Sequence, residues 1–141
     1  TAIGVRGIRL ADKDRVVSLI VAESDDPILT ATEKGYGKRT QLDEYRAQAR
    51  GGSGVISIKT SDRNGQVVGA IQVTDEDEMM LISDKGTLVR ARASDVSIIG
   101  RNTQGVTLIN IADDEALVSV AKIAETEDED SDQTDDRQVK E

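Results

Sequence analysis

Basic side chains recur at matching positions along the chain, so binding to a polyanion is the first chemistry to consider. Arg39 and Arg90 are 51 residues apart, and so are Arg50 and Arg101. Cations repeated at a regular interval can neutralise successive phosphates along a bent duplex and release its counterions. Ordinary surface charge is the alternative explanation. The candidate phosphate contacts are Lys38, Arg39, Arg46, Arg50, Arg90, Arg92 and Arg101.

A glycine-rich run follows Arg50 directly and offers a second way to bind phosphate. It consists of Gly51, Gly52, Ser53 and Gly54. Glycine lets the backbone approach a ligand closely, and exposed amides beside an arginine suit an anion. The alternative is a flexible connector between structural units. The run is not an ATP-binding P-loop, because no Gly-Lys-Ser or Gly-Lys-Thr follows it.

Several kinds of chemistry are excluded by the residue types that the chain lacks. It contains no Cys and no His, which excludes disulfides, thiolate zinc sites and serine–histidine–aspartate triads. Asp128, Asp130 and Asp132 are spaced like the start of a calcium loop, but its central Gly and closing Glu are missing. Carboxylate-based hydrolysis is not excluded by residue type, although the repeats position no acid pair. We therefore expect no catalytic residue, no metal site and no cofactor.

Negative charge is concentrated at the end of the chain. The net charge is −9 overall, and residues 125–141 carry nine acidic and two basic side chains, a net charge of −7. An acidic segment with a single Val cannot bury enough apolar surface to fold, so we expect residues 125–141 to be a disordered tail. A tethered polyanion could compete with DNA phosphates for the basic residues, or it could serve solubility alone. Residues 1–124 have a net charge of −2, which is not that of a typical basic DNA-binding domain.

The sequence repeats with a period of about 50 residues. The pair Gly4-Val5 recurs as Gly54-Val55 and as Gly105-Val106. A period of this length, rich in Val, Ile and Thr, is typical of all-β propeller blades. We expect a partial propeller over residues 1–124, with about two and a half repeats of four strands. The expected repeats cover residues 4–53, 54–104 and 105–124.

Each full repeat is expected to contribute four strands in the same order. In the second repeat, Asn64-Gly65 separates the first two strands and is a strong hairpin-turn pair. The expected strands are residues 5–10, 16–21, 28–32, part of 37–45, 55–60, 67–73, 79–83, part of 87–99, 106–111 and 117–123.

The first strands of the three repeats share one alternation. Successive side chains of a strand point to opposite faces, so one position should face a core while its neighbour faces solvent or a ligand. The isoleucines at the first position are Ile8, Ile58 and Ile109, and the residues beside them are Arg9, Lys59 and Asn110.

Two and a half blades are too few to close a ring, and blades cover their sheets only by stacking. We therefore expect an open apolar face on the N-terminal side and self-association or marginal stability of the isolated chain. The chain begins with Thr1 rather than Met, which suggests a piece of a longer protein or a processed product. No apolar run approaches the ~20 residues of a membrane span and no signal peptide opens the chain, so we expect a cytoplasmic protein.

The order of these motifs resembles the C-terminal DNA-wrapping domain found in the A subunit of bacterial DNA gyrase. The resemblance rests on residues 35–40, 44–46, 48–54, 54–59, 86–90 and 100–106, and it extends over residues 1–124. Residues 48–54 follow the pattern Gln-x-Arg-Gly-Gly-x-Gly. Ala49 and Ser53 stand where the family's box has basic residues, so this is a weakened copy of the box.

The resemblance implies a β-pinwheel, a propeller variant in which neighbouring blades exchange strands. It implies a rim that binds and wraps double-stranded DNA, in support of ATP-dependent negative supercoiling near the nucleoid. The catalytic tyrosine and the ATPase would lie elsewhere, so neither Tyr36 nor Tyr45 is expected to be catalytic. The implied partners are the rest of gyrase A and the gyrase B protein, in an A2B2 assembly. The alternatives are the corresponding domain of topoisomerase IV and a propeller that binds proteins.

Overall fold

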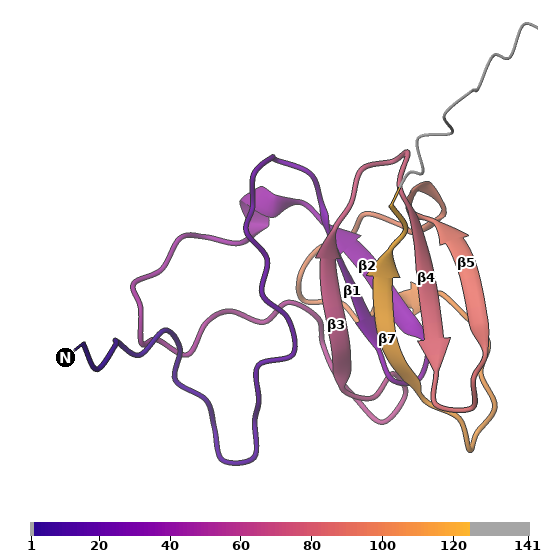
Figure 1. The fold of residues 1–141 in the computed structure, drawn as a ribbon, viewed down its shortest axis with the longest axis horizontal. Helices are drawn as coiled ribbons and strands as arrows, with labels where there is room; N and C mark the ends of the chain where they lie inside the picture. Colours follow the sequence, from indigo (N-terminus) through magenta and orange to yellow (C-terminus); the bar gives the residue numbers. More distant parts are fainter. Residues whose placement is uncertain (1, 125–141) are drawn as a thin grey trace, which may run out of the picture.

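The computed structural model describes residues 2–124, which form short antiparallel strands and two single-turn 3₁₀ helices (Figure 1). The all-β, propeller-type class expected from the sequence is confirmed. The expected acidic tail, residues 125–141, lies outside the described residues. The elements are β1 (Ile28–Thr32), β2 (Tyr36–Thr40), η1 (Leu42–Glu44), β3 (Val67–Gln72), β4 (Glu78–Ser83), β5 (Leu88–Arg92), η2 (Ala93–Asp95), β6 (Val106–Thr107) and β7 (Leu117–Lys122).

The strands form two antiparallel sheets that pack against each other through β3 and β7 (Figure 1). The first sheet has the order β3-β1-β2-β6, and the second has the order β5-β4-β7. The two hairpins β1–β2 and β4–β5 are equivalent parts of successive repeats. Each sheet therefore contains one such hairpin together with strands from later in the chain.

Successive repeats exchange strands. Leu29 of β1 pairs with Ile71 of β3, and Leu81 of β4 pairs with Val120 of β7. In both cases the strand comes from the repeat that follows the hairpin. The outer edge of β2 is covered by β6, where Gly37 pairs with Val106, 69 residues further along the chain. This exchange is the arrangement that the resemblance implied for a β-pinwheel.

Three predicted strands do not form, which corrects the expectation for residues 5–10, 16–21 and 55–60. A strand exists only where a neighbour accepts its hydrogen bonds. β6 pairs with β2, but no strand of the described residues lies beside Val55 in the same way. β3 pairs with β1, but within residues 2–124 no strand pairs with residues 16–21. The predicted strand 106–111 is present only as Val106–Thr107.

The hydrophobic core lies between the sheets and is almost entirely aliphatic. All five residues of β1 are buried, and β4 buries every second residue, including Met79 and Leu81. Ile58 and Ile109 are buried, as the alternation predicts, whereas Ile8 is 44% exposed because no sheet covers its segment. The buried cluster consists of Leu29, Ala31, Val73, Met79, Leu81, Ala93, Val96, Ile109, Leu117 and Val120.

Asn64 does not turn a hairpin, because one of the two strands that it was expected to join is absent. Its side chain is instead fully buried and connects two loops. Nδ2 donates to the carbonyl oxygens of Lys59 and Gln104, and Oδ1 accepts from the backbone N–H of Ser61. Gly65 follows with a φ of +75°, a conformation that favours glycine, and its N–H donates to the Ser61 carbonyl to close the turn 61–65.

The N-terminal part of the chain exposes an apolar surface. Residues 2–27 contain no strand, and Ile3 and Leu19 are at least 90% exposed. These residues and the loop before β3 extend to one side of the sheets (Figure 1). Apolar side chains are therefore exposed on the N-terminal side as expected, but they lie on a segment without strands and not on an open blade. None of the helices within residues 2–124 has the length and apolar character of a membrane span.

Candidate nucleic-acid interface

Lys38 is fully buried, which corrects its expected role as a phosphate contact. Its Nζ donates to the carbonyl oxygens of Gly100 and Arg101 at 2.6 and 2.5 Å, and it also contacts Thr103. Burial lowers the pKa of Lys38 to about 8, with Glu44 raising it and Arg101 lowering it further. The ammonium group thus holds the loop 100–103 on β2.

Arg39 is also buried, on the opposite face of β2. Its Nε donates to the Val96 carbonyl at 2.8 Å, and its Nη1 lies 2.5 Å from Oδ1 of Asp75. Neighbouring residues of a strand point to opposite faces, and both faces of β2 are covered. The expectation that Arg39 lines an outer edge is therefore wrong, and this guanidinium is part of the fold.

Arg90 and Arg92 lie on the outward face of β5, where alternate residues are exposed. Arg90 forms an ion pair with Glu78 of the neighbouring strand. Because a carboxylate already pairs with its guanidinium, Arg90 is less available for a phosphate. For Arg92, no hydrogen bond or ion pair of the side chain is found within residues 2–124. Arg92 is consequently the more available cation of the two.

Arg101 is half-buried, and its Nη1 donates to the carbonyl oxygen of Ile56 at 2.8 Å. Its Nε is buried without a hydrogen-bond partner among the described residues. This arrangement keeps the side chain against residue 56 of the preceding segment. Arg101 therefore differs from Arg50, its equivalent in the first repeat, whose side chain is exposed.

Arg46, Arg50 and most of the glycine-rich run remain accessible. Gly51 is half-buried, and Gly52, Ser53 and Gly54 are exposed. Gly51 and Gly54 have φ near +80°, so the run needs glycine at these two positions. Within residues 2–124 neither arginine side chain has a hydrogen-bonding partner. These residues form the accessible part of the predicted site.

The tertiary structure places a segment beside the glycine-rich run that was not among the predicted contacts. The N–H of Gly51 donates to the Gly7 carbonyl, and the N–H of Arg9 donates to the Gly52 carbonyl, both at 2.8 Å. Arg6 and Arg9 are exposed next to Arg50 as a result. The sequence offered one indication of this contact, because Arg9 and Lys59 occupy matching positions of the first two repeats. Lys59 is exposed as well.

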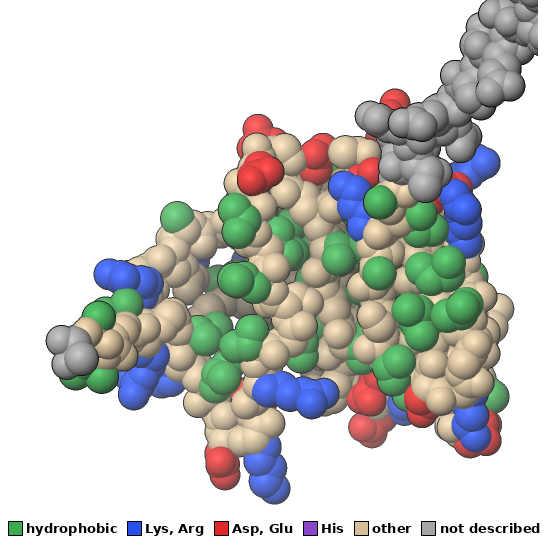
Figure 2. Space-filling model, viewed as in Figure 1, with side chains coloured by type: hydrophobic (Ala, Val, Ile, Leu, Met, Phe, Trp, Pro, Cys, Tyr) green, Lys and Arg blue, Asp and Glu red, His purple; other side chains and the backbone are tan. Residues whose placement is uncertain are grey.

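On one face of the molecule the cations lie apart from one another (Figure 2). On the face shown in Figure 2, Lys and Arg side chains lie at several separate places around the outline, with Asp and Glu between them. Hydrophobic side chains spread over the middle of this face (Figure 2).

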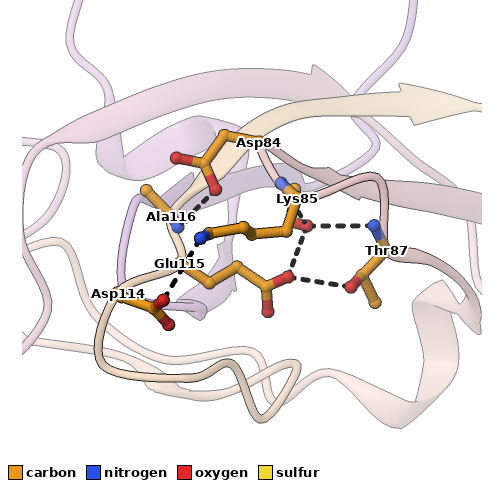
Figure 3. A network of polar contacts seen from close by, with 7 residues as sticks. Asp84, Lys85, Thr87, Asp114, Glu115 and Ala116 are labelled. Atoms are coloured by element: carbon orange, nitrogen blue, oxygen red, sulfur yellow. Dashed lines mark hydrogen bonds and ion pairs between the residues drawn. The ribbon is translucent and has the colours of Figure 1, made fainter.

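Carboxylates have a different role at the start of β7, where they connect a loop to the β4–β5 turn (Figure 3). Oε2 of Glu115 accepts hydrogen bonds from the hydroxyls of Ser83 and Thr87, each at 2.8 Å, and these hold the pKa of Glu115 below its ordinary value. Lys85 pairs with Asp114 at 3.1 Å. These acids stabilise the fold and leave Lys85 neutralised.

Both tyrosine hydroxyls lie close to a polar side chain in the described part of the chain. The guanidinium of Arg63 lies 5.1 Å from the ring centre of Tyr36, and its hydrogen bond lowers the pKa of Tyr36. The hydroxyl of Tyr45 lies 2.6 Å from Oγ of Ser57. No group of three acidic side chains in this part of the chain could hold a metal ion.

A family model described as the DNA gyrase C-terminal domain, beta-propeller, matches residues 1–23, 26–74 and 77–124. The A subunit of DNA gyrase from Escherichia coli K12 is 60% identical over 126 residues, which are 89% of this chain and 14% of that protein. Its counterpart from Salmonella typhimurium LT2 is 57% identical over 129 residues, 92% of this chain and 15% of that protein. The chain thus spans about one seventh of the length of these relatives.

Solved structures have the same fold. A structure of the DNA gyrase A C-terminal domain superposes with a TM-score of 0.80 at 33% identity, covering 86% of this chain and 41% of that one. The C-terminal domain of DNA topoisomerase IV gives a TM-score of 0.77 at 24% identity, covering 84% of this chain and 38% of that one. At that identity the second likeness concerns the fold alone.

Proposed function

The chain belongs to the family of the DNA gyrase C-terminal domain, and on that premise we propose that it binds duplex DNA and wraps it around its basic edge. Within a type II topoisomerase, such wrapping would support ATP-dependent negative supercoiling. The family match over nearly all of residues 1–124 carries this proposal. Accessible cations in successive repeats support it, because they can contact phosphates at intervals along a curved duplex.

The accessible residues define the proposed contact more narrowly than the sequence did. We retain Arg46, Arg50, Arg92 and the exposed glycine-rich run, with Arg90 and Arg101 as weaker contributors because each side chain already has a partner. Lys38 and Arg39 are left out because they are buried. Contacts of this kind reach phosphates rather than base edges, so binding should be independent of sequence.

We propose that the domain itself is non-catalytic and acts with the rest of gyrase A and with the gyrase B protein. In this proposal, cleavage and ATP hydrolysis reside in those other parts, in an A2B2 assembly that acts on DNA in the cytoplasm. The absence of His and Cys supports a binding role, because it removes the usual groups of nucleophilic and acid–base catalysis at neutral pH.

Two alternative functions have weaker support. The corresponding domain of topoisomerase IV has the same fold, but at 24% identity it lies further from this chain than the gyrase relatives at 57% and 60% identity. A propeller that binds proteins is favoured by the apolar surface of residues 2–27. Unlike a DNA contact, such a surface would bind without a strong dependence on salt.

Fluorescence anisotropy with a random duplex of about 40 bp, between about 50 and 200 mM salt, tests the proposed function. Binding should weaken steeply with salt, with a slope of log K against log [salt] of roughly −0.9 for each phosphate neutralised. A shuffled duplex of the same length should bind equally well. A chain that does not bind the duplex at the lowest salt concentration would refute DNA binding by this domain.

A further inference from the structure

Arg9, Lys59 and Asn110 occupy equivalent outward positions in the three repeats, and we call them the outward row. Each follows an isoleucine, and the isoleucines of the second and third repeats are buried. Arg9, Lys59 and Asn110 are all exposed. For Lys59 and Asn110 the exposure follows from the alternation of extended chain, which turns one neighbour inward and the next one outward, whereas Arg9 is exposed together with Ile8.

The backbone fixes the two charged members of the row in the same way. The N–H of Arg9 donates to the Gly52 carbonyl and that of Lys59 donates to the Thr103 carbonyl, both at 2.8 Å. Each bond ties an outward cation to the loop that carries an arginine, Arg50 in one repeat and Arg101 in the next. In each of the first two repeats, the bond thus joins the segment of an outward cation to the loop of an arginine.

Lys59 is anchored more firmly than an ordinary surface lysine. Its carbonyl oxygen accepts from Nδ2 of Asn64, at 2.9 Å, and the same amide donates to Gln104 at 3.1 Å. Asn64 is fully buried. Among residues 2–124, the side chains of Arg9 and Lys59 make no ion pair with a carboxylate. The backbone of both residues is therefore held in place, and within residues 2–124 no carboxylate pairs with either side-chain charge.

Charge changes in one direction along the row. The equivalent stretches 6–15, 56–65 and 107–116 have net charges of +2, +1 and −3. In the third stretch the outward residue is Asn110, and three acidic residues follow it at 113–115. A polyanion would be attracted most strongly at the first repeat and repelled at the third.

We propose that Arg9 and Lys59 are phosphate contacts for duplex DNA and that the outward row ends at Asn110. This inference rests on the proposed function and adds a direction to it. The duplex lies against the first two repeats beside Arg50 and Arg101, and it leaves the protein surface before the third. No base edge is read, because a long exposed side chain beside a loop reaches the duplex backbone.

The test measures the same salt series for Arg9→Gln, Lys59→Gln, the double variant and Asn110→Lys in the 141-residue chain. Each loss of a cation should reduce the magnitude of the salt slope by about 0.9 and weaken binding about fivefold to tenfold at about 0.1 M salt. Asn110→Lys should strengthen binding and steepen the slope. Lys85→Gln is the control, because Lys85 is paired with Asp114 and lies outside the row.

Circular dichroism and thermal melting of each variant separate folding from binding, since all three positions are exposed. If the unmodified chain binds DNA but the double variant matches it in affinity and slope, the inference is overturned and the proposed function stands. If the double variant and Lys85→Gln weaken binding equally, the effect is general charge and the inference is overturned. If the unmodified chain does not bind DNA, both proposals fail.

Discussion

Nζ of Lys38 lies 2.6 Å from the carbonyl oxygen of Gly100, a residue 62 positions further along the chain. Arg101 and Thr103 provide further acceptors to the same ammonium group. An ammonium surrounded by carbonyl oxygens satisfies them all at once, which no apolar side chain can do. A residue that seemed suited to phosphate is therefore a clamp between β2 and a distant loop.

Replacing Lys38 with Met should lower the free energy of unfolding by about 2–4 kcal/mol, because buried carbonyl oxygens would lose their donor. Urea unfolding followed by circular dichroism measures this change. The matched control is Arg46→Met at an exposed position, which should change stability by no more than about 0.5 kcal/mol. Equal stability of the two variants would contradict the role of Lys38 as a clamp.

Gly105→Ala should be more destabilising than Gly86→Ala. Both glycines have φ above +80°, so each alanine carries a similar backbone strain of about 1–2 kcal/mol. A Cβ at Gly105 would also lie 2.5 Å from the Gly37 carbonyl, whereas one at Gly86 would meet nothing within 4 Å. Because the backbone strain is similar in both variants, the difference between their melting temperatures measures the effect of the close approach of β6 to β2 on stability. Equal melting temperatures would show that this approach is unimportant.

Acid should weaken the contact of Glu115 with the β4–β5 turn. The pKa of Glu115 is lowered in the folded chain, so its contribution is present above the ordinary value of 4.5 and is lost as the pH falls through the lower folded value. Glu115→Gln should therefore flatten the fall of melting temperature below pH 4.5. Glu76→Gln, at an exposed position without a side-chain hydrogen bond among residues 2–124, should leave that fall unchanged.

Removing residues 125–141 should tighten DNA binding, because the segment carries a net charge of −7 and competes with phosphates for the same cations. The gain should be largest at low salt, where charges are least screened. Anisotropy at the two ends of the salt series compares the shortened chain with the full one. An affinity that does not change at either salt concentration would leave solubility as the role of this segment.

The sequence predicted most of the regular structure correctly. Short aliphatic runs at matching positions of the repeats predicted β1, β3, β4, β5 and β7 close to their observed positions, because a strand's apolar residues are a local feature of the sequence. The period of about 50 residues indicated propeller blades for a similar reason, since each blade repeats one local pattern. The inward and outward positions of Ile58, Lys59, Ile109 and Asn110 were also predictable in this way.

Only the tertiary structure decided which strands pair and which cations are available. Residues 5–10, 16–21 and 55–60 have strand-like sequences, yet a strand also needs a neighbour, and the exchange of strands between repeats determines where that neighbour lies. Lys38 and Arg90 are both basic residues in equivalent hairpins, but one is buried and the other is exposed. The difference comes from the loop 96–103, which lies about 60 residues after Lys38 in the sequence and provides the carbonyl oxygens of Gly100 and Val96 to Lys38 and Arg39 of β2. Burial depends on such distant packing, and no local pattern encodes it.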